Sequence, residues 1–237
     1  MYVLTRPTLL TLLLTLLLNC ALTSTVNASD LSEVLDQLVT AYGGESNLRK
    51  LDQMTQEWVL VAKMGNRHGT DRRRIRTPGQ LRVDLNYPDK SETRILDNDK
   101  AYVLFDGKNT GEVSTMQRDA MRLQLMRLYS PLILRDKIDS VGLKEEAGLL
   151  ALSLVENGVH VFYLVNKENW RIEKVAGSLL FNGREIQFLT EYSDFAFVEG
   201  VLVHRKENKY ASGMNTAVLN LHQIRFDSKF DDSVFSP

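Results

Sequence analysis

The chain has 237 residues and a formal net charge of −1, from 29 Lys and Arg against 30 Asp and Glu. Near-neutrality argues against a general nucleic-acid binder, which concentrates positive charge on its surface. Cys20 is the only cysteine. Because we expect its segment to be removed, the remaining part has no disulfide, no thiol nucleophile and no thiolate metal ligand.

The opening of the chain has the pattern of a secretory signal. Arg6 is its only charged residue, and residues 9–18 form a leucine-rich run too short to cross a bilayer as a helix. Residues 26–28 (Val-Asn-Ala) then place small or β-branched side chains at the two positions that a signal peptidase inspects. We therefore expect a signal peptide over residues 1–28, cleavage after Ala28 and export of residues 29–237. The alternatives are an uncleaved anchor and a lipoprotein cut before Cys20.

A helical pattern follows this segment. Ser29-Asp30 can cap a helix, and one apolar stripe continues as far as Gly43-Gly44, which is a typical helix stop. A second short helix is expected over residues 45–54. From Thr55 the apolar period changes to two, which predicts strands.

The predicted strands follow one another through short turns, of which Asn157-Gly158 is the strongest hairpin signal. They cover residues 56–64, 70–76, 81–87, 92–96, 100–105, 149–155, 159–165, 170–175, 184–192, 201–210 and 216–226. Because no helices alternate with these strands, the order favours an antiparallel meander in one domain, residues 29–237.

Residues 115–129 interrupt the strands with a helical pattern that Pro131 is expected to end. Apolar residues occupy much of the circumference, so we expect this helix to lie half sunk in the domain. Met116, Met121 and Met126 lie on it, and methionine suits both promiscuous binding surfaces and irregular cores. The helix is therefore either a lid over a binding site or a part of the core.

The predicted fold is mainly β (α+β): a strongly curved antiparallel half-barrel of about ten or eleven strands, covered by an N-terminal and a mid-chain helix. Such a sheet has one concave apolar face, which is suited to acyl chains. The residues expected at this face, as a lipid-binding cavity, are Trp58, Leu60, Leu81, Val83, Leu85, Tyr102, Leu104, Leu152 and Leu154. The alternative is that they simply pack against one another.

A dense basic run covers residues 71–76. Every second arginine lies on one face of this strand, namely Arg72, Arg74 and Arg76. Arg73 and Ile75 lie on the other face. The candidate contacts for a lipid phosphate or an acidic partner are Arg72, Arg74, Arg76 and Arg82. The alternative is a solvated outer face.

The motifs of common enzymes are missing. The four histidines are His68, His160, His204 and His222, and none lies three to five residues from another, as short metal-binding motifs require. No nucleophile elbow, P-loop or dinucleotide-binding glycine motif occurs in the sequence. We therefore expect no metal, no cofactor and no enzyme activity, while a triad of distant residues stays open as the alternative.

Three segments resemble motifs of the outer-membrane lipoprotein-sorting protein family. Residues 191–203 (Glu-Tyr-Ser-Asp-Phe to Glu-Gly-Val-Leu-Val) are similar to its "Y-x-D-F/Y … D/E-G-V-x-x-P" strand pair. Residues 224–235 are similar to its closing "I-x-F-N-x-x-L-D-D-S-L-F", and residues 41–51 to its "A-x-G-G-x-x-x-L-x-x-I" helix pair. The chain departs from these motifs at His204, which replaces a proline, and at Phe230, which replaces a leucine.

This resemblance implies a LolA/LolB-like fold, in which helices cover the mouth of an incomplete barrel, and a location in the periplasm. Carriers of the family use an inward-facing arginine, and Arg74 and Arg82 lie on suitably placed strands here. The resemblance thus implies a non-enzymatic monomeric carrier that shields the acyl chains of a lipoprotein or lipid during transfer toward the outer membrane. Its partners would be an inner-membrane donor and an outer-membrane acceptor.

The alternative function is that of a lipid- or lipoprotein-sensing envelope regulator. The same half-barrel occurs in envelope-stress sensors that bind an anti-sigma factor. A second domain would favour this function, and the sequence shows none.

Overall fold

The structure is a computed structural model that describes residues 28–146, 149–181, 183–226 and 228–237. Residues 1–27 of the predicted signal, Cys20 among them, lie outside the described residues. Its last residue, Ala28, is the first residue of helix α2 (Ala28–Ala41). Among the described helices, none is both long and apolar enough to cross a membrane.

One antiparallel sheet of thirteen strands forms the body of the protein, in the order β6-β5-β4-β3-β2-β1-β13-β12-β11-β10-β9-β8-β7. Strands that follow one another in sequence pair with each other, except β6 and β7, and the first strand also pairs with the last. The strands are β1 (Gln53–Ala62), β2 (Arg67–Arg76), β3 (Gln80–Tyr87), β4 (Lys90–Asp97), β5 (Lys100–Phe105), β6 (Lys108–Glu112), β7 (Val141–Glu146), β8 (Leu149–Glu156), β9 (Val159–Asn166), β10 (Arg171–Phe181), β11 (Arg184–Val198), β12 (Val201–Ala211) and β13 (Met214–Arg225).

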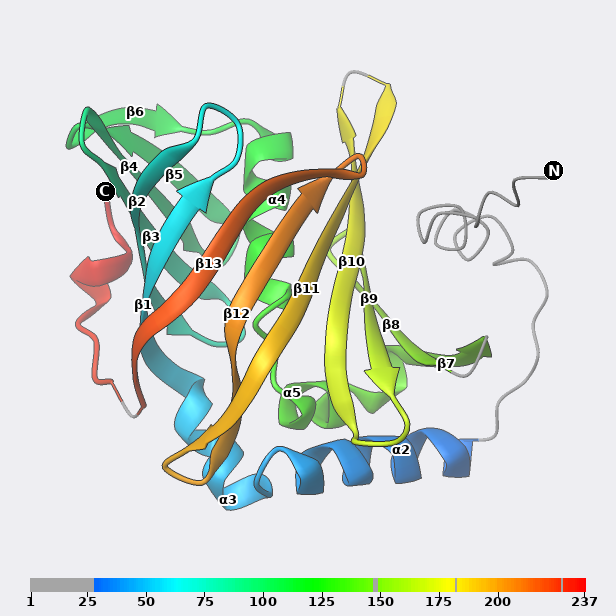
Figure 1. Ribbon diagram of the computed structural model, residues 1–237. Coiled ribbons are helices and arrows are strands. Elements are labelled where there is room, and N and C mark those ends of the chain that lie inside the picture. Colours follow the sequence, from blue (N-terminus) through cyan, green and yellow to red (C-terminus); the bar gives the residue numbers. More distant parts are fainter. Residues whose placement is uncertain (1–27, 147–148, 182, 227) are drawn as a thin grey trace, which may run out of the picture.

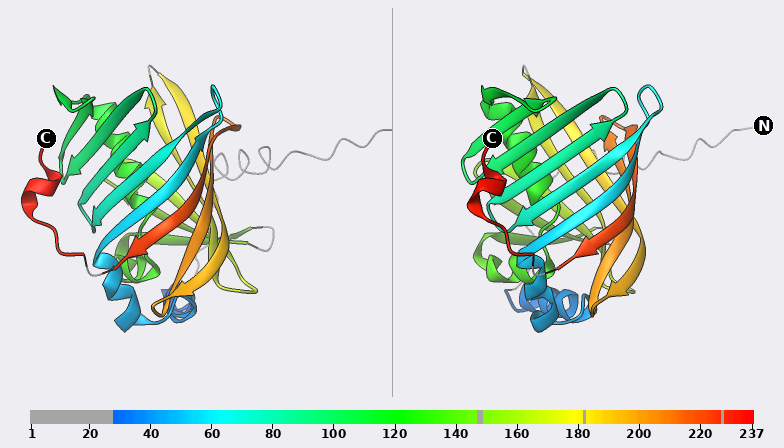
Figure 2. Two further views of the ribbon diagram at one scale, coloured as in Figure 1. Left: turned by 60° about the vertical axis from the view of Figure 1, so that its left-hand side comes forward. Right: turned by 90° about the vertical axis from the view of Figure 1, so that its left-hand side faces the viewer.

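The sheet curls into an incomplete barrel with β6 and β7 as its two edges (Figures 1 and 2). Alternation sets its two faces: in β3, Leu81, Val83 and Leu85 are buried, whereas the residues between them are more exposed. The turn at Asn157-Gly158 joins β8 to β9, and both residues have positive φ (50° and 81°), as a tight hairpin turn requires. That predicted hairpin is confirmed.

Helix α4 (Thr115–Met126) runs inside the curved sheet (Figure 1), where it contacts β3, β4, β5, β9 and β10. Ser114 starts the helix with a capping box, because its hydroxyl accepts from the Gln117 amide while the Gln117 side chain accepts from the Ser114 amide. Met121, Leu123, Leu125 and Met126 are buried. The helix therefore fills much of the concave side.

Three further helical segments lie across one end of the barrel (Figure 1): α2, the short α3 (Glu45–Leu48) with the 3-10 turn η1 (Arg49–Asp52), and α5 (Pro131–Asp136). The apolar stripe of α2 is buried as predicted, with Leu35 and Leu38 fully covered. Tyr42 joins α2 to the sheet, because its carbonyl accepts from the Leu202 amide (3.1 Å) and its hydroxyl from the Ile172 amide (3.0 Å).

Two sequence predictions about helices are wrong. Residues 49–54 do not continue a second α-helix, because η1 and then β1 begin there. Pro131 does not end the mid-chain helix: α4 ends at Met126, and Pro131 is the first residue of α5, with Ser130 as its N-cap. Proline has no amide hydrogen to donate, so it fits the first turn of a helix as well as the end of one.

The count of ten or eleven strands is also wrong, since two more are present. β6 and β7 are the two edge strands. All five residues of β6 are exposed, so it shows no apolar alternation from which a strand could be predicted.

The C-terminal segment covers part of the outer face of the sheet (Figure 2). The 3-10 turn η3 (Asp232–Phe235) packs on β3 and β4 and buries Phe235 almost completely. A further 3-10 turn, η2 (Ile138–Ser140), precedes β7.

Candidate functional site

Arg73 on β2 lies at the centre of a charged cluster on the concave face. Its side chain is only 1% exposed, and its guanidinium binds two carboxylates. Its Nη2 lies 2.9 Å from Asp71 Oδ2, and its Nη1 lies 2.8 Å from Glu207 Oε1 on β12. The guanidinium also stacks over the Trp58 ring at 4.9 Å.

Glu207 links this arginine to two other side chains. His204 Nε2 lies 3.2 Å from Glu207 Oε1, and Lys209 Nζ lies 3.4 Å from Glu207 Oε2. The His204 ring in turn stacks on Tyr192, with 4.0 Å between the ring centres. The polar cluster thus ties β2 to β12 across the concave side of the sheet.

Burial and pairing oppose each other in this cluster. Burial alone would raise the pKa of Glu207, but Arg73, Lys209 and the hydrogen bonds from His204 and Arg73 hold it well below its usual range. Burial alone would lower the pKa of Arg73, but Asp71 and Glu207 raise it. The ion pair is therefore fully charged at neutral pH.

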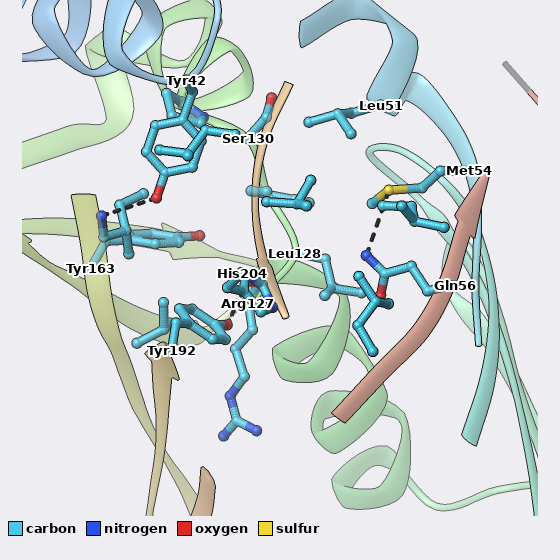
Figure 3. A pocket seen from close by; sticks show the side chains of 18 residues that line it. Tyr42, Leu51, Met54, Gln56, Arg127, Leu128, Ser130, Tyr163, Tyr192 and His204 are labelled. Carbon is cyan, nitrogen blue, oxygen red and sulfur yellow. Dashed lines mark hydrogen bonds between the residues drawn. The ribbon is translucent and has the colours of Figure 1, made fainter. Parts of the chain in front are cut away.

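A small pocket of about 70 Å³ lies under the helices at the barrel mouth (Figure 3), and we call it the mouth pocket. Tyr42, Tyr163, Tyr192, His204 and Arg127 are among its lining residues. Ligand pockets for small molecules are usually about 300–1,000 Å³. In this closed form the mouth pocket therefore has no room for an acyl chain.

A larger cavity, of about 260 Å³, lies between α4 and strands of both halves of the sheet, and we call it the cationic cavity. It is lined by Arg94, Ala120, Leu123, Gln124, Arg127, Leu179, Phe188, Lys209, Tyr210, Ala211 and Thr216. Arg127 lines both this cavity and the mouth pocket.

Tyrosine hydroxyls fasten the C-terminal end of α4 to the barrel. Tyr163 on β9 donates to the Met126 carbonyl (2.8 Å), and Tyr192 on β11 donates to the Arg127 carbonyl (2.9 Å). These carbonyls would otherwise lack partners at the helix end. Just after the helix, Tyr129 Oη lies 2.9 Å from the Pro78 carbonyl and 2.8 Å from Glu156 Oε2.

The nine residues predicted to form a lipid cavity do not line either cavity in the part of the chain that the structure describes. Seven of them are buried in the core: Trp58, Leu60, Leu81, Val83, Leu85, Leu152 and Leu154. Leu81 pairs with Leu96, and Leu96 pairs with Ala101, so Ala101 lies on the same concave face as Leu81. Because side chains alternate along β5, Tyr102 and Leu104 lie on the opposite face. Their expected place on the concave face is wrong.

The predicted lid residues lie on the helix inside the barrel. Met121 and Met126 are buried at 4% and 0% exposure, within the core cluster, and Met116 is half-buried. In this form α4 both covers the concave face and belongs to the core.

The four candidate headgroup arginines lie on the outer face, where carboxylates of the chain itself pair with them. Arg74 and Arg82 both bind Asp84, at 2.7 and 3.1 Å. Arg72 lies 3.4 Å from Glu57, and Arg76 lies 2.7 Å from Asp232 of the C-terminal segment. The inward arginine on these strands is Arg73, not Arg74 or Arg82.

Several inward polar residues were not predicted as site residues: Arg73, Arg94, Arg127, Glu207 and Lys209. A signal existed for Arg73, since it alternates with Ile75 on the face opposite the outer arginines. Among the described residues, no three His, Cys, Asp or Glu side chains gather as metal ligands.

A scan against protein-family models finds no match to this sequence. A search of curated proteins finds no match either.

Solved structures do match. A LolA superfamily protein from Nitrosomonas europaea is 14% identical, with a TM-score of 0.54 over 90% of this chain and 99% of that one. A domain assigned to the outer membrane lipoprotein-sorting proteins, from Vibrio parahaemolyticus, is 10% identical, with a TM-score of 0.53 over 89% and 97%. The chain thus has the fold of these two structures, which is the fold that the resemblance of its motifs implies.

Proposed function

We propose that this protein is a non-enzymatic carrier that shields the acyl chains of a lipid or lipoprotein in the periplasm, on the way toward the outer membrane. The observation that carries the proposal is the single helix inside an open curved sheet. Helix α4 covers apolar side chains of β3, β5, β9 and β10, and the sheet has two edges rather than a closed seam.

The driving force is apolar burial. When α4 moves away from the sheet, core side chains on the strands that it contacts, such as Val83, Val161 and Val175, become a surface for hydrocarbon. Each methylene that leaves water contributes about 0.8 kcal/mol. The burial of several acyl carbons therefore offsets the free energy that is lost when the apolar side of α4 leaves the sheet. Binding of this kind needs no catalytic group.

The pinned end of α4 fits this movement. The tyrosine hydrogen bonds hold its C-terminal end, whereas its N-terminal end begins at the exposed Ser114 after the exposed edge strand β6. We therefore expect the helix to open from its N-terminal end and to pivot near Arg127. Export with cleavage after Ala28 is part of this proposal, and N-terminal sequencing of the mature protein should begin at Ser29.

The test uses Met121→Asp and, as a matched control, Met64→Asp, which changes an exposed methionine of the β1–β2 turn. A carboxylate at position 121 stands where hydrocarbon would bind, and burying it is costly. We expect Met121→Asp to weaken binding of a fluorescent fatty acid at least about tenfold in the folded fraction. Met64→Asp should leave the affinity unchanged.

Thermal melting of both variants, read together with their affinities, shows whether α4 acts as a lid over a binding site or only as part of the core. If Met121→Asp loses stability while its folded fraction binds the probe as wild type does, α4 is ordinary core and the carrier proposal is contradicted.

A further inference from the structure

Arg127 at the end of α4 has no carboxylate partner among the described residues. Two of its guanidinium nitrogens, Nε and Nη2, have no exposed surface and no hydrogen-bond acceptor among the described residues. Figure 3 shows the guanidinium pointing away from Tyr42 and Ser130, toward the interior beside α4. Its Cζ lies 5.6 Å from the centre of the Phe188 ring.

The other charges nearby do not complete the site. Arg94 and Lys209 line the same cavity, and none of its described lining residues is acidic. Two carboxylates beside the cavity residues already have partners, because Glu92 binds Arg94 at 2.6 Å and Glu207 binds Arg73 and Lys209. Three cationic side chains thus face one cavity, and Arg127 is the one without a carboxylate partner in the part of the chain that the structure describes.

A buried guanidinium without acceptors is unfavourable, because its lost hydration is not replaced. Because Nε and Nη2 have no exposed surface, the guanidinium would shift toward the cavity for an anion there to supply the missing acceptors. Arginine suits this task, since its planar donors match the oxygens of a carboxylate or a phosphate.

Apolar side chains, with Leu123, Leu179 and Phe188 among them, form much of the rest of the cavity, beside the polar Gln124, Tyr210 and Thr216. Its volume of about 260 Å³ is several times the roughly 30 Å³ of one water. It therefore has room for a small anionic group and the first carbons of a chain. An anion with an attached hydrocarbon fits these walls better than a free inorganic ion.

We propose that the cationic cavity binds the anionic headgroup, carboxylate or phosphate, of an acyl-chain amphiphile, with Arg127 as its anchor and Arg94 and Lys209 as supporting charges. This inference rests on the proposed carrier function and names its cargo as an anionic lipid rather than a neutral one.

Titration calorimetry on the full mature protein tests it with four ligands: decanoate, decyl phosphate and decanol, which share one chain length, and inorganic phosphate. We expect decanoate or decyl phosphate to bind at least about tenfold more tightly than decanol, because charge-assisted hydrogen bonds form only with the anions. The better of the two anions identifies the headgroup.

Arg127→Met should abolish this preference and leave decanol binding unchanged. Arg205→Met is the matched control, since Arg205 is an exposed arginine on β12 that binds Asp194. It should keep the preference. Thermal melting should show Arg127→Met at least as stable as wild type, because the change removes an uncompensated charge.

Three results would overturn the inference. Equal affinity of wild type for decanoate, decyl phosphate and decanol would leave the carrier function intact but exclude an anion site. Tight binding of inorganic phosphate with no gain from the decyl chain would make the cavity a phosphate site instead. Absence of binding by all four ligands would contradict the inference and the carrier function together.

Discussion

Arg73 shows how a polar cluster can stand in an apolar interior. Its guanidinium meets Asp71 and Glu207, so its donors and their acceptors satisfy one another. Two carboxylates around one arginine leave one negative charge in excess, and Lys209 offsets it at 3.4 Å from Glu207. A buried pair of this kind adds little net stability, but removal of one partner leaves the other charge in apolar surroundings without compensation.

Glu207→Gln should therefore destabilise the fold by about 3 kcal/mol, since Arg73 and Lys209 lose their shared carboxylate. Urea unfolding measures the effect. Asp194→Asn is the control, because it breaks the exposed pair with Arg205 and should cost less than about 1 kcal/mol. Equal losses in the two variants would show that the buried cluster carries no special weight.

The same carboxylate predicts an acid dependence of stability. The pKa of Glu207 is held well below its usual range in the fold, although burial opposes this, so the folded state binds fewer protons than the unfolded state. Its contribution is complete above the ordinary glutamate value, about pH 4.3, and is lost as the pH falls toward the folded value.

The free energy of unfolding of wild type should accordingly fall more steeply than that of Glu207→Gln below that pH. Urea titrations at a series of acid pH values compare the two slopes. Parallel slopes would place the acid sensitivity elsewhere in the molecule.

At the residue scale, alternation was the reliable part of the sequence prediction. It placed Leu81, Val83 and Leu85 on one face, and they are buried together. In β5 the side chains do alternate, but the choice of the inward face was wrong. Tyr102 and Leu104 were expected to face inward, whereas the pairing with β4 places Ala101 and Val103 there. The residues that line the cationic cavity could not be predicted from a local sequence pattern, because they come from strands that are far apart in sequence.

At the element scale, α4 is the part whose position decides between a filled and an open barrel. Its apolar side contacts strands from both halves of the sheet, and its C-terminal end is held by two tyrosine hydroxyls. Its first turn follows the exposed β6, and Arg118 there donates to the Asp99 carbonyl at the longer distance of 3.4 Å. Elements that move are drawn from the less stable parts of a fold.

The double variant Tyr163→Phe and Tyr192→Phe removes both hydroxyls and keeps the rings. We expect a loss of about 1 kcal/mol for each hydrogen bond and an unchanged association rate of a fluorescent fatty acid, because the pinned end stays in place when the helix opens from its N-terminal end. Tyr102→Phe, on the outer face, is the control. Stopped-flow fluorescence compares the rates, and faster association in the double variant would show that α4 opens from its C-terminal end instead.

Elements with strong periodicity were predicted and edge elements were not. The strand at residues 100–105 has the expected bounds, and the mid-chain helix begins at the expected residue. β6 was missed because its five residues are all exposed. β10 and β11 extend beyond their predicted ends, to Phe181 and Val198, because pairing with neighbours continues past the apolar stretch.

At the scale of the whole molecule, the open sheet follows from the order of its parts. The described strands form two meanders, β1–β6 and β7–β13, which the pairing of β1 with β13 joins into one sheet. The two edges, β6 and β7, are connected through α4 and α5. The curvature brings Arg94 on β4 and Lys209 on β12 to one cavity, although they lie in different halves of the sequence. The overall class could be read from local patterns, but this convergence depends on the curved shape of the sheet.

Native mass spectrometry of the mature protein, purified from its own envelope without detergent, tests the carrier function most directly. We expect a population heavier than the bare chain by the mass of an acyl lipid, which dissociates on activation and leaves a folded protein. A bare mass alone, both after purification and after incubation with lipid vesicles, would contradict the carrier function.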